Sequence, residues 1–437
     1  METPDIKNPQ FVDLHIHSKY ARATSKNCDL ENLAKNAKIK GLTVLGTGDF
    51  THPIWLKELK SKLEWQDGIY EYGGIKFMPT TELSLVYTQG GKGRRIHHIL
   101  FAPNLEVVDQ INAWIDTKGR RDYDGRPIFG FSSIELVEKM MTIDKNIMII
   151  PAHVWTPWFG LLGSMSGFNS LEECFQDKTK NIHAIETGLS SDPAMNWRVS
   201  SLDKYAIVSF SDNHSPTPNR IGRECTLFDH KEITYKKITD DIKNKQFKMT
   251  IEFFPEEGKY HYDGHRNCGV SFSPEESNRL KKICPVCKRP MIIGVQNRVE
   301  ELADRPEGFV PKNAIPFKSF VPLIEAISFI EGTSSTSKKA SELYGNMIER
   351  FGNEFNILIN TSEDDLKKYT SEKLTNFIIR MRKGDVKFIP GFDGVYGKPI
   401  LDQNNIPKLD IKPDKPDIKK KTGIKIKEKS LGDFLSK

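Results

Sequence analysis

The sequence predicts an α/β fold built around a barrel of parallel strands, followed by a small metal-binding module and a mostly helical C-terminal region. Three observations predict it. Before residue 240, about seven short apolar runs alternate with helical stretches, which is typical of parallel strands joined by crossover helices. Residues 250–305 are rich in Cys, His and turn residues. From 306 to 400, apolar residues recur mainly at helical spacing.

The expected strands of the first region, residues 1–240, end in polar or titratable residues. They lie in segments 11–17, 42–49, 75–83, 95–103, 146–153, 182–188 and 205–214. Between the first two, residues 30–40 (LENLAKNAKIK) have the apolar spacing of an amphipathic helix. In α/β barrels the carboxyl ends of the strands meet at one rim, where catalytic side chains gather. We therefore expect the polar strand ends to lie close together.

Composition excludes several classes of protein. The 437 residues are 38% hydrophobic and 28% charged, which is enough apolar material for a core. The sequence has no apolar run long enough for a membrane span and no secretory signal at its start. The six cysteines are few for this length and favour a metal site over a disulfide framework. We expect a cytoplasmic, nucleoid-associated protein without membrane partners. The net charge of +6 permits a polyanionic partner without requiring one.

The first strand carries the pattern FVDLHIH. The period of a β-strand places Asp13, His15 and His17 on one face, so the two imidazoles can bind one cation. Later strand ends supply more candidate metal ligands: Asp49, Glu82, His98, His153, Glu186, Asp212 and His214. Burying such groups together without a metal is costly, which favours a metal centre over scattered structural histidines. Adjacent residues on a strand face opposite sides, so we expect His97 to pack or to orient a neighbour.

These motifs resemble the polymerase-and-histidinol-phosphatase (PHP) superfamily: DLHIHS, GTGD, TTE, His98, PAH and SDNH occur in its order. The resemblance implies a distorted (β/α)7 barrel with two or three divalent metals. It places His15, His17, Glu82 and Asp212 at one metal, and it makes Glu82 a bridge to a second metal held by His98 and His153. His214 would contribute to a third. The usual TDH of the second strand is GDF here, so Asp49 or His52 would replace the missing imidazole.

Mixed imidazole and carboxylate ligands favour Zn, Mn or Fe over Mg, which prefers an oxygen shell. Two such cations activate water and neutralise charge on a phosphoryl group. We therefore expect Glu82, Asp212 and His214 to act in phosphoester hydrolysis. Arg22, Arg94, Arg95 and Arg220 are candidate phosphate contacts, with plain surface solvation as the alternative for each.

A second metal site is predicted between residues 250 and 305. His265 and Cys268 are followed after fifteen residues by Cys284 and Cys287, which is the paired spacing of a structural zinc site. Four protein ligands leave no open coordination position, so this zinc would hold shape. His261 is a competing ligand with poorer spacing.

The barrel motifs followed by HYDGHRNCGV, CPVC and RVEELADRP closely resemble the endonuclease Q family of DNA-repair nucleases. The resemblance covers residues 11 to about 400. It implies cleavage 5′ of deaminated bases (hypoxanthine, uracil or xanthine) and at abasic sites. A damaged base is cheaper to unstack than a paired one, so we expect a pocket for a displaced nucleotide between the barrel mouth and the zinc module. The helical region 306–400 is expected to bind DNA.

The last segment, residues 401–437, reads as a disordered tail with nine lysines between 408 and 429. It ends in a pattern that resembles a sliding-clamp (PCNA) interaction peptide, in which Leu431, Phe434 and Leu435 would enter a hydrophobic groove. The alternative is a slightly apolar chain end. A clamp peptide of this kind also indicates an archaeal source.

The function predicted from the sequence is a lesion-specific DNA endonuclease. One alternative is a PHP phosphatase acting on a small phosphate ester, for which the zinc module, basic tail and clamp peptide would have no use. A second is a non-catalytic DNA-binding adaptor, which would be expected to have lost metal ligands such as His15, His17 and Asp212; all three are present.

Overall fold

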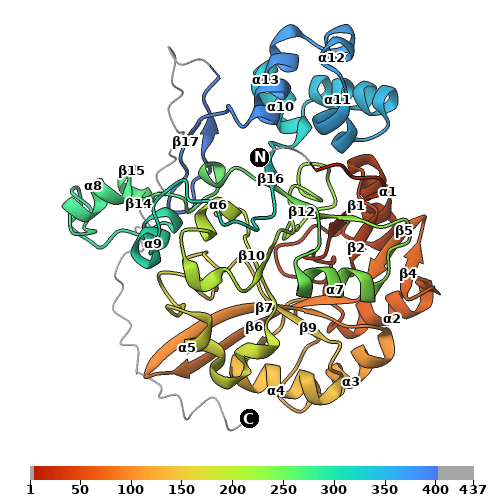
Figure 1. Cartoon of the computed structure of the whole chain (residues 1–437), viewed down its shortest axis with the longest axis vertical. Helices are drawn as coiled ribbons and strands as arrows, with labels where there is room; N and C mark the ends of the chain where they lie inside the picture. The colour runs from red at the N-terminus through yellow and green to blue at the C-terminus, as the bar shows by residue number, and fades with distance from the viewer. Residues whose placement is uncertain (1–3, 402–437) are drawn as a thin grey trace, which may run out of the picture.

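The computed structural model describes residues 4–401 and shows a mixed α/β body with two smaller lobes (Figure 1). The body is built from short strands covered by helices. Its strands are β1 (Pro9–Asp13), β2 (Val44–Gly46), β3 (Glu64–Gln66), β4 (Ile69–Tyr72), β5 (Ile75–Met78), β6 (Thr80–Gln89), β7 (Lys92–Phe101), β8 (Ile128–Phe129), β9 (Met148–Pro151), β10 (Ala184–Glu186), β11 (Ala206–Val208), β12 (Cys225–Asp229), β13 (Met249–Glu252) and β16 (Phe317–Ser319).

These strands form three sheets. The largest has the order β16-β13-β12-β1-β2-β5-β4-β3, a second has the order β8-β6-β7-β9, and the third is the pair β10-β11. The pairs β1–β2, β2–β5 and β10–β11 are parallel, as expected for strands joined by crossovers. A single bridge between Ile16 and Asn213 links the extension of β1 to the segment after β11.

The hairpin of β6 and β7 departs from the expected repetition of parallel strands. The two strands pair antiparallel from Thr80↔Phe101 to Gln89↔Lys92. They are joined by Gly90 and Gly91, both with positive φ, and a two-residue Gly-Gly turn of this kind connects neighbouring antiparallel strands. A parallel crossover needs about a dozen residues. This hairpin decides which side chains reach the candidate site.

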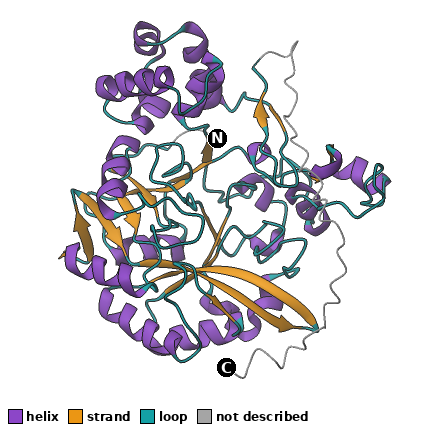
Figure 2. Ribbon diagram, turned by 180° about the vertical axis from the view of Figure 1, so that it is seen from behind, coloured by secondary structure: helices purple, strands orange, loops and turns teal. Residues whose placement is uncertain are grey.

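Helices cover the outer faces of the sheets (Figure 2). Helix α1 shows why they form where they do: Asp29 caps its first turn by accepting from the Asn32 N–H, and Gly41 ends it in the left-handed conformation. The body contains α1 (Leu30–Lys40), α2 (Pro53–Lys62), α3 (Leu105–Asp116), α4 (Ser133–Ile143), α5 (Leu171–Phe175), α6 (Pro193–Asn196), α7 (Tyr235–Asn244) and short 3-10 turns at Gln176–Asn181, Ser200–Leu202 and Pro255–Glu257.

The inner faces of the three sheets share one apolar core. Its buried members come from all three sheets and pack as one cluster: Val12, Leu14, Val44, Met78, Ile99, Phe101, Ile150, Ala152, Ala184, Ala206, Val208, Phe210 and Phe228. Side chains that follow these strands at their carboxyl ends therefore converge above this core.

Two lobes follow the body. The first holds β14 (Asp263–His265), a 3-10 turn (Arg266–Cys268), β15 (Val270–Phe272), α8 (Pro274–Arg279) and α9 (Val295–Leu302). The second holds α10 (Leu323–Glu331), α11 (Lys338–Phe351), a π-helical turn (Asn356–Asn360), α12 (Glu363–Tyr369) and α13 (Glu372–Lys383), and it forms the separate helical group near the top of Figure 1. The strands β17 (Phe388–Ile389) and β18 (Lys398–Pro399) come last.

Two sequence-based expectations concern membranes and the tail. None of the helices between residues 4 and 401 has the length and apolar character needed to cross a bilayer. The basic tail and the clamp peptide, with Leu431, Phe434 and Leu435, lie outside the residues that the structure describes.

Candidate metal centre

The first group of candidate ligands forms where β1 ends. His15 and His17 lie two and four residues beyond the end of β1, and both imidazoles are buried. Their Nε2 atoms lie close to two carboxylates, that of Glu82 near the start of β6 and that of Asp212 in the segment after β11. His15 Nε2 lies 3.5 Å from Glu82 Oε2 and 3.6 Å from Asp212 Oδ1. His17 Nε2 lies 3.2 Å from each of the same two oxygens. The sequence-based expectation that these four residues come together is met.

The donor atoms in this group fit a cation. Among the described residues, His15 Nε2, His17 Nε2 and Asp212 Oδ1 are buried without any hydrogen-bond partner. Burying polar atoms unpaired costs free energy, whereas two imidazole nitrogens and two carboxylate oxygens directed at one point form a ligand set suited to a divalent transition metal.

Two further carboxylates orient the imidazoles. Glu186 Oε1 accepts from His15 Nδ1 at 2.9 Å, and Asp49 Oδ1 accepts from His17 Nδ1 at 2.9 Å. Each bond fixes the ring so that Nε2 faces the group, as is usual for metal-bound histidines. Both residues had been predicted as ligands. That assignment is corrected, because their second oxygens are also occupied: Asp49 Oδ2 by the N–H and hydroxyl of Ser18, Glu186 Oε2 by the His153 N–H.

Backbone strain accumulates at the same place. Asp49, His153 and Asp212 have φ values of 47°, 30° and 45°, in a region that non-glycine residues rarely adopt. Strained conformations persist where the surrounding contacts hold them, and they cluster at functional sites. All three residues lie two to four positions beyond a strand end, so the strain accompanies the turn of the chain over the rim.

A second group shares Glu82 with the first. Glu82 Oε1 lies 2.6 Å from His97 Nδ1 and 3.2 Å from His153 Nε2. These two nitrogen atoms are 3.2 Å apart. These three residues are buried and form another possible metal-binding group. Glu82 thus offers one oxygen to each group, which is how a bridging carboxylate is placed between two cations.

The second group contains His97 where the sequence had indicated His98, and that prediction is wrong. In the hairpin Ser84 lies opposite His97 and Leu83 opposite His98. Glu82 and Ser84 are on one face, so His97 shares the face of Glu82 and His98 is on the other. There His98 Nε2 bonds to Ser133 Oγ at 2.7 Å, and its ring packs against Phe175.

His214 lies beside the first group without belonging to it. Its Nδ1 is 3.1 Å from the Asp212 carbonyl, and its ring centroid is 4.5 Å from that of His17. Burial lowers the pKa of His214. His52, suggested as a replacement ligand, is elsewhere and stacks on Tyr20.

Arg126 was missed by the sequence analysis. Its Nη1 donates to Glu82 Oε2 at 2.9 Å, so a guanidinium lies at the shared carboxylate. Arg126 precedes β8 in a DGRP turn, and nothing in that local pattern marks it as part of the site. Of the four predicted phosphate-contacting arginines, Arg220 lines the opening of the site, while Arg94 is engaged by the Gly167 carbonyl.

The charges of the site are strongly coupled. Burial alone would lower the pKa of His15, but the carboxylates of Glu186, Asp212 and Glu82 outweigh it and raise that pKa well above its usual value. Burial would raise the pKa of Glu82, but His97, Arg126 and His15 hold it well below its usual value. The Glu82 carboxylate is therefore held in its ionised form although it is buried.

A pocket of about 550 Å³ opens onto both groups. We call it the mouth pocket. His97, His153, Asp212 and His214 line its floor, and the walls are mainly aromatic and basic: Trp158, Phe159, Arg220, Arg223, Lys259, Tyr260 and Tyr396. Lys259 and Tyr260 belong to the segment leading into the Cys-rich lobe, so the pocket reaches from the strand ends to the point where the chain enters this lobe.

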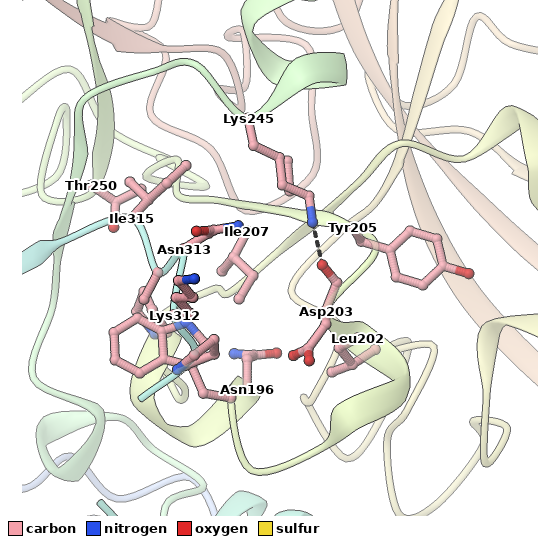
Figure 3. Close-up of a pocket in the computed structure, with 15 residues that line it drawn as sticks. Asn196, Leu202, Asp203, Tyr205, Ile207, Lys245, Thr250, Lys312, Asn313 and Ile315 are labelled. Carbon is pink, nitrogen blue, oxygen red and sulfur yellow. Dashed lines mark hydrogen bonds between the residues drawn. The ribbon is translucent and has the colours of Figure 1, made fainter. Parts of the chain in front are cut away.

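Another pocket lacks the features of a reaction centre. It has a volume of about 300 Å³ and is lined by residues of α6, β11 and the segment 311–315 (Figure 3). Two of its three charged side chains already have partners: Lys245 Nζ donates to the Asp203 carbonyl, and the Asp203 carboxylate binds Arg305. None of the clustered His, Glu or Asp residues lines it.

The Cys-rich lobe holds the third possible metal-binding group. His265, Cys268, Cys284 and Cys287 come together, with His265 Nδ1 3.3 Å from Cys287 Sγ. Burial would raise the pKa of Cys284, but the N–H groups of Cys287 and Val286 outweigh it and lower that pKa to about 7. The competing ligand His261 is outside the group, stacked beside Tyr262.

Replacing Cys284 and Cys287 together with Ser should remove one equivalent of bound metal and lower the thermal unfolding temperature. Thiolates are the preferred ligands of a structural zinc, and hydroxyl groups do not replace them. Metal content by mass spectrometry and unfolding by calorimetry measure the two effects. The matched control is Cys28→Ser with Cys174→Ser, since these buried thiols lie apart from the group. Equal metal content in both variants would contradict the site.

The fold and the two His–carboxylate groups define a class of protein: an α/β enzyme with a candidate metal centre suited to phosphoester hydrolysis. The crystal structure of the lesion-specific endonuclease PfuEndoQ from Pyrococcus furiosus is 30% identical, with a TM-score of 0.81 over 90% of this chain and 96% of that chain. Endonuclease Q in complex with a 27-mer duplex bearing an abasic lesion is 31% identical, with a TM-score of 0.82 over 92% and 98%. The chain belongs to the endonuclease Q family and is an endonuclease.

Sequence comparisons add two relatives. YqxK from Bacillus subtilis is 28% identical over 89% of this chain and 98% of its own length. MJ0043 from Methanocaldococcus jannaschii is 33% identical over 291 residues, which are 64% of this chain. The match spans about a third (34%) of the length of MJ0043. The family described as the MJ0043 C-terminal domain matches residues 322–385, the helical lobe.

Proposed function

We propose that this endonuclease is lesion-specific and hydrolyses the phosphodiester bond 5′ of deaminated bases (hypoxanthine, uracil or xanthine) and at abasic sites. The observation that carries the proposal is Glu82, which offers one oxygen to each of two buried ligand groups at the floor of the mouth pocket. Two adjacent cation sites beside an open pocket suit the in-line hydrolysis of a phosphodiester. Membership of the endonuclease Q family supports DNA as the substrate.

In this proposal His15, His17, Glu82 and Asp212 hold one divalent cation, and Glu82, His97 and His153 hold another. When bound, the cations supply an activated water and neutralise phosphoryl charge. The mixed ligands fit Zn or Mn better than Mg. Arg126 holds a fixed positive charge against Glu82. Burial lowers the pKa of His214 and so favours its neutral imidazole, which could accept a proton from a group in the mouth pocket or return one to it.

The mouth pocket would receive the lesion nucleotide. Its volume of about 550 Å³ falls within the roughly 300–1,000 Å³ of small-ligand sites. The rings of Phe159, Tyr260 and Tyr396 offer apolar faces to a base, and Arg220 and Lys259 offer charge to a phosphate. An abasic or deaminated nucleotide leaves the helix at lower cost than a paired one, which favours its entry into this pocket.

Several finer features are part of the same proposal. The three sheets around one core would correspond to the distorted (β/α)7 PHP barrel. The group of His265, Cys268, Cys284 and Cys287 would hold a structural zinc. The helical lobe would contact DNA, and the C-terminal peptide would bind a sliding clamp. Since the relatives include a bacterial and an archaeal protein, the archaeal source stays a prediction.

The decisive experiment incubates the protein with Mn²⁺ or Zn²⁺ and duplexes that carry one hypoxanthine, uracil, xanthine or abasic site. We expect one cut on the 5′ side of the lesion, no cut in an undamaged duplex, and loss of cleavage after chelation, which returns when metal is added. A small chromogenic phosphate ester, tested in parallel, should be a poor substrate. Hydrolysis of the ester with all duplexes left intact would favour the phosphatase alternative.

A further inference from the structure

Trp158 lies on a ridge between the mouth pocket and a second hollow. The second hollow, of about 400 Å³, is also lined by Val86, Arg95 and Met165. Trp158 lines both. It is 38% exposed, and Val86 and Met165 are exposed to a similar degree. The ridge therefore presents an indole with apolar neighbours beside the candidate metal centre, although most tryptophans are largely buried.

The ridge is attached firmly to the metal centre. The Thr156 hydroxyl donates to the Trp158 carbonyl at 3.0 Å, and its oxygen lies 2.9 Å from His153 Nδ1. On the other side, the Phe159 carbonyl accepts from the His97 N–H, and the Phe159 ring packs on the His97 ring at 4.4 Å. Trp158 thus has a fixed position relative to the candidate ligands His97 and His153.

Unpaired positive charge lies next to the ridge. The hairpin of β6 and β7 runs as a long pair to the edge of the molecule (Figure 1), and its outer part carries Lys92 and Arg95. In the part of the chain that the structure describes, no carboxylate lies within 4.0 Å of either cation. The Arg95 guanidinium lies 5.4 Å from the centroid of the Trp158 ring. An exposed aromatic beside free cations is complementary to a nucleic acid, which has stacked bases and a charged backbone.

We propose that Trp158 fills the gap left in duplex DNA when the lesion nucleotide moves into the mouth pocket, while Arg95 and Lys92 contact phosphates of the flanking duplex. The inference rests on the proposed function and names the residue that stabilises the displaced state. Because the indole separates the two hollows, a nucleotide in one and intact duplex over the other would leave Trp158 at the vacated position in the stack. Stacking on the indole offsets the cost of unstacking the nucleotide.

The test compares duplex with single-stranded substrate. Trp158→Ala should lower kcat/KM about tenfold or more on a duplex with one abasic site, which corresponds to the loss of one base–aromatic stack. On the same strand without its complement the loss should be much smaller, because no paired stack has to be opened. Trp158→Phe should recover most of the duplex activity. Trp65→Ala, which removes a similarly exposed indole on β3, is the matched control and should have no effect.

A binding readout separates this role from a purely structural one. In the Asp212→Asn background, 2-aminopurine opposite the abasic site should change its fluorescence on binding, and Trp158→Ala should abolish that change. Equal losses of activity on duplex and single strand, or unchanged 2-aminopurine fluorescence, would overturn the inference while leaving the proposed function intact. Failure of the unmodified protein to cut either substrate would instead remove the proposed function.

Discussion

Asp212→Asn should reduce cleavage of a lesion-containing duplex by about a thousandfold or more, because cation catalysis of phosphoryl transfer is worth several kcal/mol and each 1.36 kcal/mol is tenfold in rate. Asp212 Oδ1 is a buried oxygen without a partner, within 3.6 Å of the Nε2 atoms of both His15 and His17. Asparagine keeps the shape and removes the negative charge that a divalent cation needs.

DNA binding by this variant should change little, since the mouth pocket and the basic residues around it remain. Single-turnover cleavage and fluorescence anisotropy with a labelled abasic duplex measure the two quantities separately. Asp240→Asn, on an exposed part of α7, is the control for losing one carboxylate. If Asp212→Asn cleaves at the original rate with its metal content unchanged, Asp212 is not a ligand.

The orienting carboxylate provides a graded comparison. Asp49 contacts His17 Nδ1 and is not itself directed at the group, so Asp49→Asn should weaken metal binding by roughly 10–100-fold, the usual range for residues that orient metal ligands. We therefore expect the loss of metal binding to be largest for Asp212→Asn, smaller for Asp49→Asn and smallest for Asp240→Asn. This order follows from the contacts of the three carboxylates.

Sequence reasoning located the site because it depends on strand ends. His15, His17, His153 and Asp212 follow the ends of strands, and Glu82 lies near the start of β6. A period of two and a common rim bring these five residues together. Sequence reasoning chose the wrong histidine where the register of the β6–β7 hairpin determines which side chain reaches the site. Whether His97 or His98 shares a face with Glu82 depends on the pairing set by the Gly90–Gly91 turn, and an isolated strand pattern does not contain that pairing.

Other residues were assigned wrongly, or missed, for a different reason. Asp49 and Glu186 have the residue type and position of ligands, but their oxygens are used by Ser18, His15, His17 and the His153 N–H. A sequence pattern does not reveal which lone pairs a neighbouring donor takes. Arg126 reaches Glu82 from a loop, and loops carry no periodicity from which a side-chain direction can be predicted.

The helical lobe is attached to the loop that lines the site. Glu354, between α11 and the π-helical turn, accepts from Lys40 Nζ of α1 at 2.7 Å, and both side chains are buried. Lys40 also donates to the Pro218 carbonyl, and Asn219 donates to Glu325 of α10. The segment 215–223 continues to Arg220 and Arg223, which line the mouth pocket. The sequence had suggested only DNA binding for this lobe. Its contacts with Lys40 and Asn219 indicate that it also holds the segment 215–223 in place.

Glu354→Gln should lower the free energy of unfolding by about 3–5 kcal/mol, the typical cost of leaving one member of a buried ion pair without its partner. The Leu323 N–H and the Tyr344 hydroxyl bond to different oxygens of Glu354, at 3.0 and 2.8 Å. Glutamine can accept from the Leu323 N–H through its carbonyl oxygen and donate from its amide nitrogen to the Tyr344 hydroxyl oxygen. The loss therefore reports the uncompensated Lys40 ammonium. Denaturant unfolding followed by fluorescence measures it.

The double variant Lys40→Met with Glu354→Gln separates charge from packing. With both charges gone, no unpaired ion remains inside, so much of the lost stability should return. Glu363→Ala, which breaks an exposed pair with Lys367, should change stability far less. If the double variant is as unstable as the sum of its single variants, the ion pair does not hold the lobe. If Glu354→Gln also raises KM for the lesion duplex and the double variant reverses it, the lobe positions the loop that carries Arg220.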